Sequence, residues 1–327
     1  MSKAKTNAKT KAVVLVSGGL DSMLAAKLLL EQGIEVIGVC FESLFFGCEK
    51  AKKAAEQLGI KLKIVKLGKD YINLIQKPKH GYGAGINPCI DCHAFMLRKA
   101  KAVMKKVSAQ VIATGEVLGS RPFSQNLQAM KIVEAESGLK GKLLRPLSAK
   151  VLPETDAEKK GLVDKEKLRG IKGRSRKVQI ELAEEYNLKY PSPAGGCLLC
   201  EKEYAKKLRD LFEHSEQAEK DIELLKLGRH FRADGVKIIV GRNEIENNKL
   251  MKIGKSWIKL EAAKIPSPIT LLRDKKAVKK AAQLTAYYAD SKGMKEVEIK
   301  YGKDRKLNKS ISVSVPEKKG VEEVRVR

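Results

Sequence analysis

The chain has 327 residues, of which 43% are hydrophobic and 32% are charged, and its formal net charge is +27 at pH 7. No apolar run approaches the roughly 20 residues that a membrane helix needs, so we exclude an integral membrane protein and expect a cytoplasmic one. The positive charge is spread along the whole chain, which favours a polyanionic partner such as nucleic acid. A lysine-rich proteome is the alternative explanation.

Strand and helix patterns alternate after a basic tail, residues 1–10, that we expect to be disordered. The strand patterns cover 12–16, 34–41, 61–67, 109–114 and, more weakly, 130–135, and the helical patterns cover 21–32, 48–58, 70–76 and 93–106. This alternation predicts an α/β domain over residues 11–150 with a doubly wound, mainly parallel sheet. Such sheets bind ligands at the carboxyl ends of their strands.

A glycine turn follows the first predicted strand. The segment Ser17-Gly18-Gly19-Leu20-Asp21-Ser22 lies where that strand passes into a helix. Glycines let the backbone approach an anion closely, and the N–H groups at the positive end of the helix then bind it. The segment lacks the lysine of the common GxxxxGKS or GxxxxGKT nucleotide loop. It therefore predicts a phosphate site of another type, with an ordinary glycine turn capped by Asp21 as the plainer alternative.

The six cysteines divide into two groups. Cys40 ends an apolar run and is interpreted as a small core residue, Cys48 is given no role, and no disulfide framework is expected. The other four form two CxxC pairs, Cys89/Cys92 and Cys197/Cys200. Proline and glycine flank these pairs, which indicates a soft metal site rather than core cysteines, and spacing leaves zinc and iron–sulfur both open. Cys92 is expected to be rich in thiolate, because a helix starts there.

The amino-acid composition changes twice in the remainder of the chain. Residues 151–214 are polar and basic, and we expect a linker with helices near 175–187 and 201–213 that carries the second cysteine pair. Its densest cationic cluster, just before that pair, contains Lys172, Arg174 and Arg176. Residues 215–327 are expected to form a smaller α+β domain with a strand at 236–240 and a helix at 274–289.

The segment SGGLDS resembles the loop of the N-type ATP pyrophosphatases, the PP-loop family, which split ATP between the α and β phosphates and adenylate an oxygen. The resemblance implies ATP and Mg²⁺ as cofactors, with Mg²⁺ near Asp21. It implies a nucleotide site made of Ser17, Gly18, Gly19, Asp21, Ser22, Phe41, Thr114, Gly115 and Arg145. An arginine in the apolar stretch around Arg145 is alternatively held by a buried ion pair.

The order of the motifs is similar to that in the tRNA thiouridylases: SGGxDS, NPxxxC, a strand that ends in Ala-Thr-Gly, and a glycine-rich cysteine loop. Those enzymes adenylate a uridine carbonyl and replace its oxygen with sulfur. Cys92 and Cys197 match the two reactive cysteines of the bacterial 2-thiouridylases. Cys89 departs from them, because that family usually has an aspartate there as general base, and Asp91 is the substitute. The likeness covers about residues 11–213.

Three of these cysteines (Cys89, Cys92 and Cys197) also resemble those of sulfurtransferases that depend on an iron–sulfur cluster. That resemblance implies a 4Fe–4S cluster, with zinc as the alternative, and leaves Cys200 as the least defined ligand. Residues 229–300 resemble NFACT-R, the RNA-binding domain of ribosome quality-control proteins, through Lys237-Ile238-Ile239-Val240-Gly241-Arg242-Asn243 and Ile265-Pro266-Ser267-Pro268. The candidate RNA contacts are Arg121, Lys172, Arg174, Arg176 and Arg242, for which surface salt bridges or solvated charge are the alternative.

The sequence is therefore interpreted as an ATP-dependent tRNA sulfurtransferase with tRNA as its partner and sulfide or a persulfide carrier as its sulfur donor. Two alternatives stay open. One is a PP-loop ligase or amidotransferase that acts on a small molecule and holds structural zinc. The other is a non-catalytic RNA-binding factor.

Overall fold

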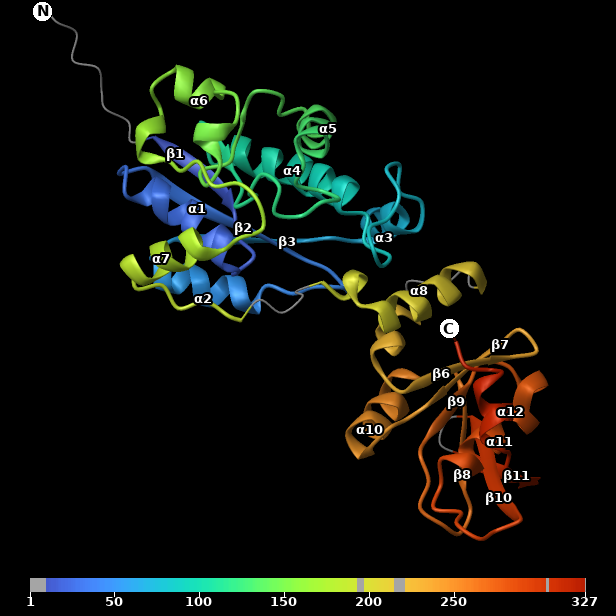
Figure 1. Cartoon of the computed structure of the whole chain (residues 1–327). Coiled ribbons are helices and arrows are strands. Elements are labelled where there is room, and N and C mark those ends of the chain that lie inside the picture. The colour runs from blue at the N-terminus through green and yellow to red at the C-terminus, as the bar shows by residue number, and fades with distance from the viewer. Residues whose placement is uncertain (1–9, 193–196, 215–220, 304–305, 327) are drawn as a thin grey trace, which may run out of the picture. The chain divides into compact units, whose positions relative to one another are not determined.

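The computed structural model describes residues 10–192, 197–214, 221–303 and 306–326. The chain divides into two compact units, Met1–Cys200 and Glu201–Arg327, and each is built around its own β-sheet (Figure 1). Within the described part of the chain, no helix combines the length and the apolar character needed to cross a membrane.

The first unit contains a five-stranded parallel sheet in the order β3-β2-β1-β4-β5. Its strands are β1 (Lys11–Leu15), β2 (Glu35–Glu42), β3 (Lys61–Lys66), β4 (Val111–Ala113) and β5 (Leu143–Leu144). The central strand β1 is buried on both faces, since Val13 joins one core cluster while Ala12 and Val14 join the other. The predicted α/β class is confirmed.

Helices cover both faces of this sheet (Figure 1). One face carries α1 (Leu20–Leu30), α2 (Glu49–Leu58) and α7 (Lys177–Glu185), and the other carries α4 (Cys89–Lys106) and α5 (Leu127–Ser137). A further helix, α3 (Lys69–Gln76), packs against α4.

The weak strand predicted at 130–135 is wrong, because these residues lie inside α5. The Asn126 side chain caps the start of this helix by accepting a hydrogen bond from Ala129 N, and Gly138 ends it with φ 65°. These two capping residues specify a helix, although the apolar run at 130–135 suggested a strand. The edge strand is β5, which pairs with β4.

Residues 151–192 and 197–200 belong to the first unit, which differs from the expected linker over 151–214. Ala157, Val163, Leu168 and Leu182 all join the core beneath α1. The short elements here are η1 (Ala149–Val151), α6 (Asp156–Lys159), η2 (Lys165–Lys167) and η3 (Leu198–Cys200). The next helix, α8 (Lys202–His214), belongs to the second unit, so the boundary falls between Cys200 and Glu201 rather than near 214.

The second unit is an α+β domain, as predicted, with an antiparallel six-stranded sheet in the order β11-β10-β8-β9-β7-β6. The strands are β6 (Arg229–Ala233), β7 (Val236–Val240), β8 (Ile258–Ala262), β9 (Thr270–Leu272), β10 (Glu296–Lys303) and β11 (Lys306–Ser314). The remaining helices are η4 (Ile222–Lys226), α10 (Glu244–Ile253), η5 (Lys275–Ala277), α11 (Val278–Tyr287) and α12 (Lys318–Glu322). The main core of this unit lies between the sheet and α11.

Cys40 and Cys48 form a disulfide with a Cα–Cα distance of 6.1 Å. This corrects the expectation that Cys40 is only a core residue and that Cys48 has no role. The reason is tertiary: the end of β2 and the residue before α2 lie side by side, at a separation that a disulfide can span. Both residues are buried in the core below the glycine turn.

Candidate active site

The glycine turn lies at the carboxyl end of β1, where α1 begins at Leu20. The N-cap residue of α1 is Gly19, which has no side chain to satisfy the first helical N–H groups. Ser22 Oγ donates to the Gly19 carbonyl oxygen (2.8 Å) and accepts from Ser17 N (3.3 Å), so the two serines hold the turn closed. An N-terminus without a side-chain cap leaves helix N–H groups for an anion.

Gly18 holds this turn against α2. Its φ is +80°, and a Cβ atom there would lie 2.3 Å from the Lys50 carbonyl carbon. Only glycine meets both conditions, because L side chains disfavour this φ and backbone atoms cannot yield space. The first glycine of the motif therefore serves the packing of α2 as well as the shape of the turn.

Gly115 connects the end of β4 to the same turn. A Cβ atom at this residue would lie 2.6 Å from the Asp21 carbonyl oxygen and 2.6 Å from Ser22 N. The segment after β4 thus packs directly on the first turn of α1. The strand ends that sequence analysis placed at one edge of the sheet do meet there.

The Asp21 carboxylate lies beside the turn. Within the described chain, the buried Oδ1 atom accepts no hydrogen bond. Burial raises the pKa of Asp21, while the Arg176 charge, a Gln179 hydrogen bond and the Arg121 charge act to lower it. A buried carboxylate oxygen with no donor, next to an anion-binding turn, fits Mg²⁺, which prefers oxygen ligands and bridges to phosphate.

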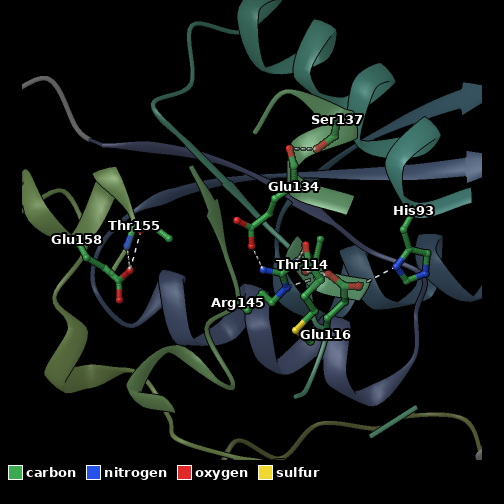
Figure 2. Close-up of polar contacts among 9 residues, drawn as sticks. His93, Thr114, Glu116, Glu134, Ser137, Arg145, Thr155 and Glu158 are labelled. Atoms are coloured by element: carbon green, nitrogen blue, oxygen red, sulfur yellow. Dashed lines mark hydrogen bonds and ion pairs between the residues drawn. The ribbon is translucent and has the colours of Figure 1, made fainter. Parts of the chain in front are cut away.

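A buried ionic network lies next to Gly115 (Figure 2). At its centre, Glu116 Oε1 is 2.8 Å from His93 Nδ1, while Glu116 Oε2 accepts from Thr114 Oγ1 (3.0 Å) and Arg145 Nε (3.1 Å). Arg145 also pairs with Glu134 through Nη1. Burial acts to raise the pKa of Glu116, but the charges of Arg145 and His93 outweigh it and hold that pKa at about 2.

This network contains Arg145, for which the sequence left two interpretations open. The side chain is only 2% exposed, and its guanidinium is shared by two carboxylates. The buried ion pair is therefore the arrangement that the structure contains, and a role of Arg145 at an ATP phosphate stays a prediction. Thr114 is likewise turned inward, toward Glu116.

The first cysteine pair lies on α4. This helix begins at Cys89 rather than at His93, so both cysteines lie in its first turn. Tyr71 Oη is 3.1 Å from Cys92 Sγ, and Asn87 Nδ2 donates to Cys89 Sγ (3.2 Å). Burial raises the pKa of Cys92 to about 12, which corrects the expectation of a thiolate-rich residue: desolvation outweighs the helix N-terminus.

The second cysteine pair reaches the first through backbone contacts. Ile86 N donates to the Leu199 carbonyl oxygen (2.9 Å), and Leu198 N donates to the Phe45 carbonyl oxygen (3.2 Å). Gly85 makes room, since a Cβ atom there would lie 2.4 Å from the Leu199 carbonyl oxygen. Residues more than a hundred positions apart in the sequence thus form one cluster.

Three of the four thiols in this cluster form a chain of hydrogen bonds. Cys200 hydrogen-bonds with Cys89 and with Cys197. The bond to Cys200 and burial both raise the pKa of Cys89. Cys92 lies in the same cluster, close enough for the charges of Cys89 and Cys200 to act on it. The four soft donors fit a thiophilic metal, which would deprotonate the thiols on binding.

His93 joins the thiol cluster to the glycine turn. It follows Cys92 on α4, is close enough to Cys89 for the two charges to interact, and hydrogen-bonds with Glu116. Glu116 in turn follows Gly115, which packs on Asp21. Burial acts to lower the pKa of His93, and the Glu116 charge outweighs this and raises it. A continuous path of contacts therefore connects the thiols to the phosphate turn.

A second group of candidate metal ligands lies nearby. Among the described residues, only His80, Asp91 and Glu136 place three His, Cys, Asp or Glu ligand atoms within 4.8 Å of one another. The Lys79 ammonium lies 2.6 Å from Glu136 Oε1, so this group already contains its cation. The four thiols are more widely spaced than these three ligand atoms. Zinc, with zinc–sulfur distances of about 2.3 Å, would therefore draw the thiols closer together on binding.

Asp91 and Phe41 lie in other surroundings than sequence analysis implied. The two carboxylate oxygens of Asp91 accept the backbone N–H groups of Lys79 (3.0 Å) and His80 (3.1 Å). Asp91 thus holds the 79–80 segment on α4. The Phe41 side chain is 5% exposed and packs in the core with Val39 and Ile90.

The candidate RNA contacts fall into two groups. Arg121 and Arg174 are exposed and Arg176 is partly buried, and both Arg121 and Arg176 act on Asp21. Lys172 is brought near Arg121 because Gly173 N donates to the Leu118 carbonyl oxygen (2.7 Å). Arg242 belongs to the second unit, where it pairs with Glu246.

Sequence analysis passed over three residues of the site. Glu116 could have been found, since it directly follows the predicted strand end Ala-Thr-Gly. Tyr71 and Gln179 carried no signal in the sequence, because their contacts to Cys92 and Asp21 come from helices far away in the chain.

A parallel sheet with an SGGLDS turn at the end of β1 defines the class of nucleotide-binding α/β domains to which this unit belongs. Residues 7–151 match the family described as thiamine biosynthesis protein (ThiI), and residues 228–324 match the NFACT protein RNA binding domain. Both matches agree with the two resemblances that the sequence predicted.

The first domain has curated relatives. A tRNA-specific 2-thiouridylase, MnmA 2, of Fusobacterium nucleatum is 37% identical over 113 residues, 32% of this chain and 33% of the relative. A "Probable tRNA sulfurtransferase" of Thermococcus kodakarensis is 32% identical over 146 residues, 42% of this chain and 36% of the relative. The chain therefore spans about a third of the length of these relatives. A 4-thiouridine synthetase in complex with RNA and ATP is 20% identical, with a TM-score of 0.42 over 66% of this chain and 52% of that one.

Proposed function

We propose that this protein is an ATP-dependent tRNA sulfurtransferase, which adenylates a uridine carbonyl oxygen and replaces it with sulfur. One observation carries the proposal: contacts run without a break from Cys92 through His93 and Glu116 to Gly115 and Asp21. The proposed thiol site and the proposed nucleotide site would thereby lie next to each other. The relatives of the first domain, named as tRNA thiouridylases and sulfurtransferases, support the same activity.

The reaction has two steps. The uridine carbonyl oxygen attacks the α-phosphorus of ATP, the bond between the α-phosphate and the β-phosphate breaks, and pyrophosphate leaves. Sulfur at the sulfide level then attacks the ring carbon, and AMP departs with the former carbonyl oxygen. With sulfide the sequence needs no oxidant or reductant, whereas a persulfide donor also requires a thiol to reduce the sulfur–sulfur bond.

Different residues would serve the two steps of this reaction. The turn from Ser17 to Ser22 would bind the phosphates through helix N–H groups, with Mg²⁺ on Asp21 to neutralise their charge. Either Cys89, Cys92 and Cys197 would hold a 4Fe–4S cluster, which supplies an iron position open to sulfide, or Cys197 would itself carry the sulfur as a persulfide. The protein contributes chiefly by holding the uridine between phosphate and sulfur.

Replacement of Asp21 tests the nucleotide step. Asp21→Ala is expected to lower tRNA-stimulated pyrophosphate release by about 100-fold or more, because it removes the carboxylate that would hold Mg²⁺. Glu31→Ala, at the other end of α1, is the control and should release pyrophosphate at the wild-type rate. Thiouridine in the tRNA, measured by nucleoside mass spectrometry, should fall in parallel.

Two other results would contradict the proposal. If the wild-type protein releases no pyrophosphate with bulk tRNA, and Asp21→Ala changes nothing, a non-catalytic RNA-binding factor is favoured. If anaerobically purified protein is colourless and loaded with zinc, a small-molecule ligase or amidotransferase is favoured.

Binding of tRNA is proposed to use the exposed cations near the turn together with the NFACT-R domain. Lys172→Gln and Arg174→Gln are each expected to reduce the slope of log K against log salt by about one, because each removes one phosphate contact. Lys142→Gln, also exposed but on another segment, is the control and should leave the slope unchanged. Filter binding of tRNA between low and moderate salt measures these slopes.

A further inference from the structure

The four thiols of the cluster differ sharply in their access to solvent. Cys92 is buried, Cys89 and Cys197 are partly buried, and Cys200 is exposed. Cys200 is therefore the thiol of this cluster that a bulky sulfur donor reaches most easily.

Cys200 also occupies the middle of the thiol chain, with a hydrogen bond to Cys89 and another to Cys197. A sulfur atom on Cys200 is thus already in contact with the next thiol inward.

The turn around η3 enforces this contact. Cys200 N donates to the Cys197 carbonyl oxygen (3.1 Å), and residues three apart eclipse one another in a 3₁₀ turn. Leu199 anchors the turn, since it is 1% exposed and its carbonyl oxygen accepts from Ile86 N. The two sulfurs are therefore held next to each other without movement of the backbone.

We infer that Cys200 is the residue through which sulfur enters the site, as a persulfide that is passed on to Cys197. The loading step itself needs neither ATP nor tRNA, and only the use of the sulfur rests on the proposed function. The Arg121 charge, which acts on both Cys200 and Asp21, would attract an anionic sulfur donor to this position.

The transfer balances without an oxidant. The Cys200 thiolate attacks the outer sulfur of a donor persulfide, the donor sulfur–sulfur bond breaks, and the donor leaves as a thiolate with the electron pair. The Cys197 thiolate then attacks the outer sulfur on Cys200 and takes it, which restores the Cys200 thiol. One proton passes from each attacking thiol to the thiolate that departs.

Peptide mass spectrometry tests the inference on the full chain. Reduced protein is mixed anaerobically with glutathione persulfide, without ATP or tRNA, and alkylated at successive times. Wild-type protein should carry the extra sulfur first on Cys200 and later on Cys197. In Cys200→Ser, loading of Cys197 should slow on the order of tenfold, because the accessible acceptor is gone. In Cys197→Ser, the sulfur should accumulate on Cys200.

Metal content separates this role from that of a fourth metal ligand. Cys200→Ser should retain the iron or zinc of the wild-type protein, whereas Cys89→Ser should lose it. Loss of metal in both variants, or wild-type loading that begins on Cys197, would overturn the inference. If Cys200 loads as expected but tRNA is never thiolated, the proposed function fails while the inference stands.

Discussion

Gly18→Ala is expected to abolish nucleotide binding and to lower the free energy of unfolding by about 2–5 kcal/mol. The cost has two parts, because alanine disfavours the φ of +80° and its Cβ would lie 2.3 Å from the Lys50 carbonyl carbon. Relief of that clash must move either the turn or the start of α2, and both line the phosphate site. Urea denaturation and calorimetric titration with a non-hydrolysable ATP analogue measure the two effects.

Gly33→Ala is the matched control. Gly33 has a similar φ of +72°, but no described atom lies within 4 Å of its added Cβ. This variant should lose only about 1–2 kcal/mol and bind the analogue normally. Equal effects at the two positions would mean that the contact with α2 contributes nothing to the turn.

Glu116→Gln is expected to destabilise the first unit by about 3 kcal/mol, since it leaves His93 without its carboxylate partner and the buried Arg145 with Glu134 alone. Glu166→Gln is the control, because that carboxylate is exposed and pairs with Lys150 at the surface. Its loss should cost less than about 1 kcal/mol. Urea denaturation at neutral pH gives both values, and similar costs would show that the network is not the main support of this region.

The pH dependence gives a second test of Glu116. Its pKa in the folded protein is about 2, below the ordinary carboxyl value of 4.5, so the ionised form favours folding. This contribution is complete above about pH 4.5 and is lost as the pH falls toward 2. Wild-type protein should therefore lose stability steeply across that range, and Glu116→Gln should lose less. Parallel curves for the two proteins would contradict the assignment.

Local patterns in the sequence were sufficient for the fold class of both units, although not for the place of residues 151–200 or for the boundary between the units. β1, β2 and β4 carry apolar runs, β3 alternates lysine with apolar residues, and helical segments lie between these strands, so the parallel sheet was predictable. The segment at 130–135 was not, because its apolar run outweighed the two capping residues, Asn126 and Gly138, that specify a helix.

The structure added what no local pattern contains. Exposure within the cysteine cluster, the shared Glu116 between His93 and Arg145, and the disulfide between Cys40 and Cys48 all join residues that are distant in the sequence or lie on different elements. Desolvation is also invisible in a local pattern. The pKa of Cys92 depends on the burial of its side chain more than on its position at the start of a helix.

The sequence by itself determined the class of domain, and it predicted a phosphate turn and a set of sulfur ligands, because short motifs of glycine, serine and cysteine are typical of such sites. Only the tertiary structure decided which side chains neutralise one another and which thiol faces solvent. Burial and pairing arise from contacts between separate elements, and those contacts exist only once the chain has folded.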